Sequence, residues 1–235
     1  MSSRLGDALS APDTKSRYVR RLFATIAERY DLITRLLSYG QDRRWKARLV
    51  TLSAAAPGTR ALDLACGTGD IAFALAARGA QVSGLDITFR MLQLARAKGS
   101  AASFLAGDML ALPFRDGEFD LVTAGYGLRN VPDIPRALTE IHRVLKPGGR
   151  FLSLDFNRPA APAVRGVYLG YLTLVGATLG ILLHRDPDTY RYIPESIRRY
   201  PGAVRVNGMI ESAGFARSQY LPVLGGLMAI HHARR

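Results

Sequence analysis

The fold is decided by LDLACGTGD, the stretch from residue 62 to residue 70. Its short apolar run ends in a tight, glycine-rich turn, and an alanine-rich helical pattern starts directly after it at Ile71. This order predicts a strand, a loop and a helix, the first unit of an open parallel sheet. Gly67 and Gly69 can take positive φ and lack a Cβ, so a ligand can lie against their backbone N–H groups beside a partly positive helix N-terminus.

Two kinds of ligand fit such a loop. A dinucleotide pyrophosphate prefers G-x-G-x-x-G, and Ala72 is also permitted at the third position, so the glycines alone do not decide. Asp63 lies inside the strand and Asp70 directly follows the second glycine, where a pyrophosphate would meet like charge. S-adenosylmethionine carries an ammonium and a sulfonium, which tolerate these carboxylates. The acidic residues therefore favour S-adenosylmethionine, and a loop that only turns the chain is the alternative.

Composition limits the class of protein. The 235 residues are 48% hydrophobic, enough for one large domain with a core. A single cysteine, Cys66, excludes an internal disulfide, and the sequence has no C-x-x-C or H-x-x-x-H, so no metal is expected. The N-terminal sequence lacks the apolar segment of a signal peptide, so we expect a cytoplasmic protein.

The positive charge lies at the two ends of the chain. The net charge is +7 over residues 1–60, zero over residues 61–157 and +6 over residues 158–235. A nucleic acid or an anionic membrane surface would attract such basic flanks, and simple solubility is the alternative.

Helical patterns precede the first strand. One runs from Ser16 to Gly40, and a basic helix around Trp45 ends before Pro57. Residues 1–57 are therefore expected to form a helical cap that covers a pocket. This cap is also a candidate surface for a homodimer, a question that the sequence leaves open.

Strands and helices then alternate over residues 58–157, the expected cofactor-binding core. The predicted strands are Ala61–Leu64, Gln81–Asp86, Ala102–Ala106, Phe119–Ala124 and, after a turn at 147–149, Phe151–Leu154. Such alternation with short connections is typical of a doubly wound, mostly parallel α/β sheet with helices on both faces. Ligands of these sheets bind at the carboxyl ends of the strands.

The C-terminal third adds a lid and two strands. Residues 158–217 are expected to form a lid insertion and a helix, and residues 166–183 within it carry no charge. A run of about 18 apolar residues is at the lower limit for a membrane span, but its glycines, threonines and tyrosines favour a lid helix. Residues 218–235 predict an antiparallel hairpin around Gly225-Gly226, which completes a seven-stranded sheet.

Acidic residues end the second and third strands. Asp86 lies roughly 20 residues past the glycine loop, where a carboxylate accepts hydrogen bonds from ribose hydroxyls; capping of the helix after Ile87 is the alternative. Asp108, after Gly107, could accept the adenine amino group while Met109 lies on the base, or it could cap the following turn.

Four strand ends together are more specific than any one: LDLACGTGD, GLDIT, AGDMLALPF and FDLVTAGYGLRN. This is the pattern of a Rossmann-like class I S-adenosylmethionine-dependent methyltransferase. Thr68 can donate to the amino-acid end of the cofactor. The candidate cofactor-binding residues are Asp63, Gly67, Thr68, Gly69, Asp86, Ile87, Gly107, Asp108, Met109 and Gly125.

Further motifs narrow the match: YDLITRLLSYGQDRRWK (30–46), GYGLRNV (125–131), RVLKPGGRFLSLDF (143–156) and YRYIPESIRRYP (190–201). On these the chain resembles the C-methyltransferases of quinone biosynthesis, the UbiE/MenG family, from about Phe23 to the end. The resemblance implies methylation of a ring carbon of a prenylated hydroquinone, either demethylmenaquinol or a ubiquinol precursor, with S-adenosylhomocysteine as product. It also implies a protein held peripherally at an anionic membrane surface, with no nucleic-acid partner.

Four positions depart from that family's pattern. The family usually has Asn, His and Glu where Thr34, Asp42 and Asp155 stand, and commonly Ser where Gly125 stands. A hydroxyl contact to the cofactor is absent at Gly125, so only its backbone could serve. These differences bear on the exact substrate more than on the reaction.

The reaction so implied needs an ionised acceptor. A ring carbon beside a hydroxyl becomes nucleophilic when the phenol loses its proton, and a phenol pKa of about 10 leaves little phenolate at neutral pH. Arg129 and Asn130 follow the fourth strand, so we expect Arg129 to stabilise the phenolate and Asn130 to orient the hydroxyl. A salt bridge to a nearby carboxylate is the alternative for Arg129.

Arginine is a poor base, so the proton acceptor is expected to be water, Asp31 or Asp155. Tyr30 and Tyr126 would flank the ring. A methyltransferase acting on RNA or on another small molecule, and a binding module without activity, are the alternatives. Amino-methylating enzymes of nucleic acids usually carry (N/D)-P-P-(Y/F) after the fourth strand, where this chain has AGYGL.

Overall fold

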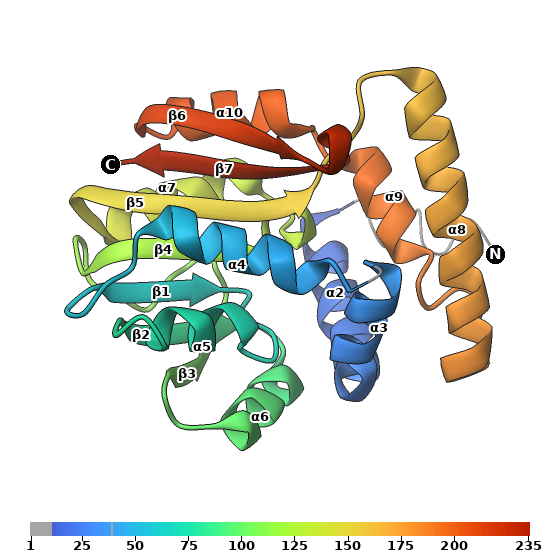
Figure 1. Cartoon of the computed structure of the whole chain (residues 1–235), viewed down its shortest axis with the longest axis horizontal. Helices are drawn as coiled ribbons and strands as arrows, with labels where there is room; N and C mark the ends of the chain where they lie inside the picture. The colour runs from blue at the N-terminus through green and yellow to red at the C-terminus, as the bar shows by residue number, and fades with distance from the viewer. Residues whose placement is uncertain (1–10, 39) are drawn as a thin grey trace.

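The computed structural model describes residues 11–38 and 40–235 and contains one seven-stranded sheet (Figure 1). The strand order is β3-β2-β1-β4-β5-β7-β6, and β7 runs antiparallel to both of its neighbours. The strands are β1 (Arg60–Leu64), β2 (Gln81–Asp86), β3 (Ser103–Ala106), β4 (Phe119–Gly125), β5 (Leu145–Phe156), β6 (Ala216–Val223) and β7 (Met228–Arg234). The expected α/β class and the closing hairpin are confirmed.

Helices bury both faces of the sheet. One face packs against α4 (Asp42–Ser53), α5 (Asp70–Ala76) and α6 (Phe89–Lys98), and the other against α7 (Ile134–Val144) and α10 (Ala203–Ser212). Leu49 and Leu75 on the first side, and Ile141 and Ile210 on the second, are fully buried. Each such side chain contributes about 1.5–3 kcal/mol by leaving water, which holds the three layers together.

The remaining helices gather at the carboxyl ends of the parallel strands, on the right of Figure 1. They are α2 (Pro12–Ile26), η1 (Ala27–Arg29), α3 (Tyr30–Leu37), η2 (Leu128–Asn130), α8 (Pro162–His184), α9 (Tyr192–Arg199) and η3 (Leu224–Gly226). Of the cap expected over residues 1–57, α2 and α3 lie at the edge of the sheet at which such folds bind ligands, whereas α4 packs on a face of the sheet. Residues 1–10 and position 39 of that cap lie outside the described residues.

The fifth strand begins earlier than expected. Leu145 already pairs with Phe119 of β4, and pairing resumes at Arg150 with Leu121 after a register shift. The turn predicted ahead of the strand therefore lies inside it, as an irregularity around Gly148, whose φ is +77°. The prediction that β5 starts at Phe151 was wrong because the chain pairs with β4 on both sides of this turn.

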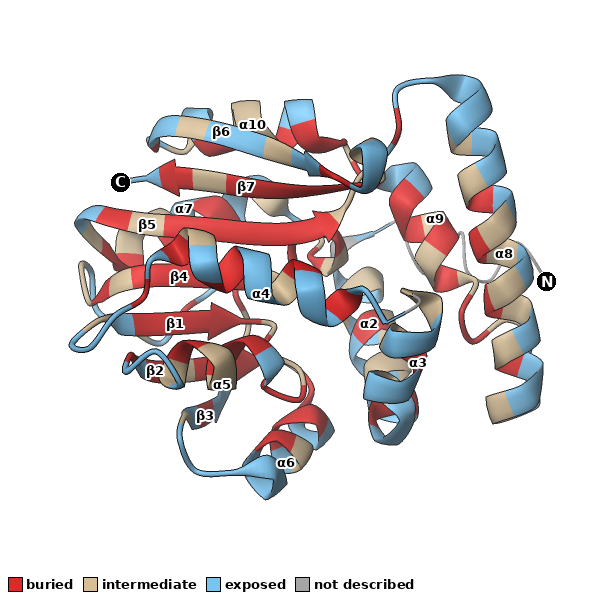
Figure 2. Ribbon diagram, in the orientation of Figure 1, coloured by how far each residue is buried: buried red, intermediate tan, exposed pale blue. Residues whose placement is uncertain are grey.

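Helix α8 is unusual in exposing an apolar face. By length and composition alone, its 23 residues could cross a membrane. Only 22% of the residues in its most apolar window are buried in the protein. Val167, Leu174 and Leu182 are each more than two-thirds exposed, while Leu169 and Leu172 pack inward (Figure 2). The helix thus covers the protein with one side and presents an apolar strip with the other.

Candidate active site

Two adjoining cavities lie at the carboxyl ends of the strands. The first follows the ends of β1, β2 and β4 and the loop after β3. The second, of about 430 Å³, is lined mainly by α2, α3, α8, the 189–193 segment and the start of β7. Four residues line both: Phe23, Tyr30, Tyr126 and Asn130. A ligand in one cavity can therefore meet a ligand in the other across these side chains.

Asp86 is held firmly at the wall of the first cavity. Its Oδ2 accepts a hydrogen bond from the Gly67 N–H at 2.9 Å, and its Oδ1 accepts one from the Thr88 N–H at 2.7 Å. Burial raises the pKa of Asp86, and the two backbone hydrogen bonds oppose this shift. Each oxygen keeps a further acceptor position, so the carboxylate can cap the turn before α6 and still accept from a diol.

The loop after β3 lines the same cavity. Gly107, Asp108 and Met109 line the cavity together with Ile87. Oδ1 of Asp108 accepts a hydrogen bond from the Leu110 N–H at 2.9 Å, so the turn cap considered as the alternative is present. The second oxygen can accept from an amino group, and the Ile87 and Met109 side chains offer apolar surface to a flat ring.

Three of the expected cofactor residues do not line the cavity: Asp63, Thr68 and Gly69. Oδ1 of Asp63 accepts a hydrogen bond from the Thr123 hydroxyl at 2.8 Å, whereas its Oδ2 is buried without a partner among the described residues. Burial raises the pKa of Asp63 to about 7. A Cβ on Gly69 would lie 2.8 Å from a Phe73 ring carbon, so packing as well as positive φ requires glycine there.

Gly125 lines the first cavity at the end of β4. A Cβ on this residue would collide with Cδ1 of Ile71 from α5. The space that a side chain at position 125 would occupy is therefore filled by the end of the Ile71 side chain.

Arg129 lies in the wall of the second cavity as half of a buried ion pair. Its Nε lies 3.2 Å from Oδ1 of Asp155, its backbone N–H donates to Oδ2 at 3.0 Å, and its Nη1 donates to the Ser196 hydroxyl. The salt bridge considered from the sequence is thus present. Because the guanidinium is also in the cavity wall, its charge still acts on a ligand there.

Asp155 lines neither cavity. It accepts hydrogen bonds from Nε and the backbone N–H of Arg129 and from the N–H of Phe156. Burial raises the pKa of Asp155, and the charge and hydrogen bonds of Arg129 oppose the rise. These contacts are better explained by a role of Asp155 in positioning Arg129 than by a role in taking a proton from the acceptor.

Asn130 stands at the junction with its amide fixed on both sides. Its Nδ2 donates to the carbonyl of Tyr126 at 2.8 Å, and its Oδ1 accepts from the Tyr192 hydroxyl at 2.9 Å. One N–H and one acceptor position remain for a ligand. Tyr30 and Tyr126 border the same junction, as expected for residues that flank a ring.

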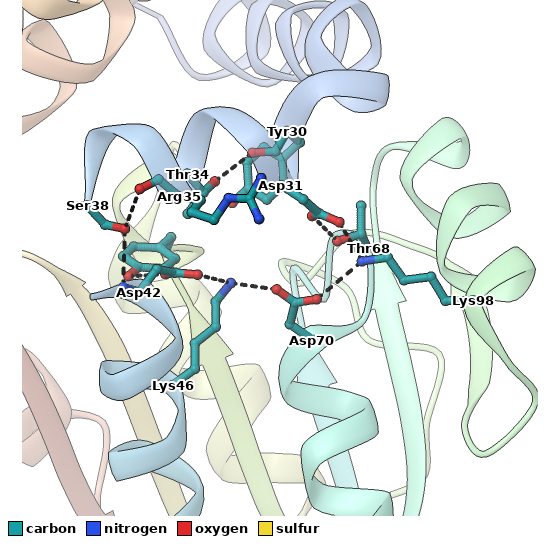
Figure 3. Close-up of polar contacts among 11 residues, drawn as sticks. Tyr30, Asp31, Thr34, Arg35, Ser38, Asp42, Lys46, Thr68, Asp70 and Lys98 are labelled. Atoms are coloured by element: carbon teal, nitrogen blue, oxygen red, sulfur yellow. Dashed lines mark hydrogen bonds and ion pairs between the residues drawn. The ribbon is translucent and has the colours of Figure 1, made fainter. Parts of the chain in front are cut away.

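Asp31 points away from both cavities. Its carboxylate accepts from the Thr68 hydroxyl and contacts Nζ of Lys98, each at 2.6 Å, in a groove between α3 and the glycine loop (Figure 3). The expectation that Asp31 takes a proton from the acceptor is not supported by this position. Sequence order alone could not indicate this, since Tyr30 beside it does reach the junction.

Comparison with known proteins identifies the family. The model of the ubiE/COQ5 methyltransferase family matches residues 11–235. The chain belongs to this family. It is 43% identical to the ubiquinone/menaquinone biosynthesis C-methyltransferase UbiE of Methylobacterium nodulans over 98% of this chain and 95% of that protein. It is 44% identical to the demethylmenaquinone methyltransferase of Thermus thermophilus over 89% of this chain and 98% of that protein.

Solved structures agree with the fold at lower identity. An S-adenosylmethionine-dependent methyltransferase from Mesorhizobium loti matches with a TM-score of 0.59 and 21% identity, covering 80% of this chain and 96% of that one. One from Aquifex aeolicus matches with a TM-score of 0.58 and 15% identity, covering 80% and 88%. Membership of the ubiE/COQ5 family confirms the expected enzyme class, an S-adenosylmethionine-dependent methyltransferase, and the Rossmann-like fold is the one expected.

Two parts of the site went unnoticed in the sequence. Ser196 contacts Arg129. It lies in the YRYIPESIRRYP motif, which indicated the family but gave no role to this serine. Asp42 accepts a hydrogen bond from Tyr126, and the departure from the family pattern at this position was the one signal that could have drawn attention to it.

Proposed function

We propose that this member of the ubiE/COQ5 family methylates a ring carbon of a prenylated hydroquinone, either demethylmenaquinol or an early ubiquinol precursor. One observation carries the proposal: a large cavity lined mostly by apolar and aromatic side chains adjoins the cavity at the strand ends. The names of the related proteins support the same substrate class.

The residues of the first cavity fit the donor. S-adenosylmethionine supplies an electrophilic methyl group when bound. In this proposal the Asp86 carboxylate accepts hydrogen bonds from the ribose hydroxyls, and the second oxygen of Asp108 accepts one from the adenine amino group. Met109 and Ile87 contact the base. The backbone of Gly67 has φ of +53°, and a Cβ there would meet only Cε1 of Tyr30, at 3.8 Å, so this side of the loop stays open to the ligand.

The acceptor ring is assigned to the junction of the cavities. Phe23, Tyr30 and Tyr126 would enclose it, while Asn130 orients its hydroxyl. The Arg129 guanidinium would stabilise negative charge on the ring oxygen. It is 4% exposed and paired with one carboxylate, so water screens its positive charge only weakly. The rest of the cavity would take the first part of the prenyl tail.

Helix α8 links this cavity to a membrane. Tyr168, Tyr171 and Leu172 line the cavity from its inner side, and its outer side carries the exposed apolar strip. The basic flanks of the chain add attraction to anionic lipid. We therefore propose peripheral attachment at the cytoplasmic face of a membrane. Dimerisation through the N-terminal helices stays a prediction.

The direct test offers the purified protein S-adenosylmethionine labelled in its methyl group and three separate acceptors. These are reduced demethylmenaquinol, an early ubiquinol precursor and RNA. The proposal expects label in one or both quinols and none in RNA. Label in RNA with none in either quinol would assign the enzyme to the other class of methyltransferase.

A further inference from the structure

The site needs a proton acceptor that the two expected carboxylates do not provide. Asp31 faces the outer groove, and Asp155 lies behind Arg129 with its oxygens engaged. At the junction of the cavities, the Tyr126 hydroxyl donates a hydrogen bond to Oδ1 of Asp42 at 2.7 Å. Asp42 is the first residue of α4 and is itself buried.

Asp42 also connects the junction to water. It lines the groove that contains Lys46, Asp70 and Lys98, whereas Tyr126 lines the two cavities. Lys46 contacts Oδ2 of Asp42 at 2.6 Å and Oδ2 of Asp70 at 2.9 Å (Figure 3). The side chains become more exposed in this order, from 8% for Asp42 to 12% for Lys46 and 41% for Asp70.

Resting on the proposed function, we propose that Tyr126 and Asp42 form a proton relay from the acceptor hydroxyl to the groove. The acceptor O–H bond breaks and its proton moves to the Tyr126 oxygen, while the Tyr126 proton moves to Oδ1 of Asp42. The phenolate carbon then forms a bond to the methyl group as the carbon–sulfur bond breaks, and the electron pair of that bond stays on sulfur. The ring-carbon proton passes to the ring oxygen as the ring regains aromaticity, and Asp42 gives its proton to water in the groove. One proton leaves per methyl group.

The surroundings of the pair keep Tyr126 protonated between turnovers. Burial, with Asp42 adding to it, raises the pKa of the Tyr126 hydroxyl well above its usual value, so Tyr126 passes a proton on without resting as an anion. Lys46 holds the Asp42 side chain in place through its contact with Oδ2, which leaves Oδ1 to the Tyr126 hydroxyl. Tyr30 from α3 and Asp155 from β5 also face the pair, and Asp31, Arg35, Arg43 and Lys98 line the groove beside Asp42.

The test is Asp42→Asn, which keeps a hydrogen-bond acceptor for Tyr126 but cannot take a proton. Loss of general-base catalysis is expected to lower kcat for demethylmenaquinol by about 100-fold at neutral pH, with KM little changed. The lost activity should return as pH rises, because the acceptor then ionises in solution. Asp70→Asn is the control, because it removes the other carboxylate partner of Lys46. Its kcat should stay within about twofold of the wild-type value, a smaller change than the loss of a general base causes.

A second measurement does not depend on turnover. 1-Naphthol absorbs at longer wavelength when ionised, so its spectrum after rapid mixing with the protein reports how fast bound naphthol loses its proton. The relay sets the rate of this transfer and not its equilibrium, so naphthol should ionise quickly on the wild type and on Asp70→Asn, and slowly on Asp42→Asn. Equal kcat in Asp42→Asn and wild type, a pH-independent loss of kcat, or equal rates of naphthol ionisation would overturn the relay. A wild type that methylates no quinol but still ionises naphthol would overturn the proposed function alone.

Discussion

Arg129 and Asp155 form an ion pair that is almost completely buried at the wall of the larger cavity. Nε and Oδ1 lie 3.2 Å apart, and the two side chains are 4% and 2% exposed. Burying two charges is costly, and removing one partner leaves the other uncompensated. The pair therefore gives Arg129 a fixed position, and it ties the chemistry of the site to the stability of the fold.

Replacing Arg129 should affect both properties. Arg129→Ala is expected to lower the free energy of unfolding by about 3–5 kcal/mol, because Asp155 stays buried without its cation. It should also lower kcat while the Kd for S-adenosylmethionine changes little, since Arg129 does not line the first cavity. Urea unfolding and calorimetric titration measure the two effects. A folded Arg129→Ala protein with normal turnover would remove its role in stabilising the phenolate.

The exposed strip of α8 predicts where the protein meets lipid. Leu174→Glu should weaken binding to vesicles that contain anionic lipid, because a carboxylate replaces an apolar contact that is 71% exposed. Sedimentation with vesicles measures the bound fraction, and added salt should release the wild type. Val204→Glu, at a site 70% exposed on α10, is the matched control and should bind like the wild type. Equal loss in both variants would indicate a general charge effect.

The buried Asp63 predicts a pH dependence of stability. Its pKa in the folded state is about 7, above the ordinary 3.8, so between these values the folded protein holds more protons than the unfolded chain. Its contribution to the free energy of unfolding should therefore fall as pH rises from about 4 to about 7. Asp63→Asn removes this term while keeping an acceptor for Thr123. The difference in unfolding free energy between variant and wild type should grow in favour of the variant over this range; a constant difference would contradict the account.

The contact between Gly125 and Ile71 predicts a compensating pair. Gly125→Ala should cost about 1–3 kcal/mol of stability, because its Cβ would collide with Cδ1 of Ile71. Ile71→Val deletes that Cδ1 atom and alone should cost about 0.5–1.5 kcal/mol. Thermal unfolding of the single and double variants completes the cycle. The double variant should be more stable than the sum of the two losses allows, and simple additivity would show that the two positions do not compete for space.

Much of the fold was readable from local patterns. The period of apolar residues marks β2 at Gln81–Asp86 without error, and the glycine loop locates the edge of the sheet where the cavities lie. Asp86 and Asp108 line the first cavity, as their place at the ends of strands indicates, because the end of a parallel strand fixes at which edge of the sheet a residue lies. Predictions of this kind depend on few long-range contacts.

The contacts between the cap and the sheet were not readable in this way. Tyr126 and Asp42 are 84 residues apart, and their hydrogen bond depends on how α4 packs on the face of the sheet. The docking of α3 turns Asp31 outward and Tyr30 inward, although they are neighbours in sequence. Pairing of β5 on both sides of its turn likewise depends on β4, which the local sequence does not encode.

The most direct measurement locates the transferred methyl group. The wild-type protein is given reduced demethylmenaquinol and S-adenosylmethionine with carbon-13 in its methyl group, and the product is analysed by carbon-13 NMR. The account predicts a labelled methyl bonded to a ring carbon. A labelled methoxy group, or a quinol that stays unlabelled while the protein binds S-adenosylmethionine, would contradict it.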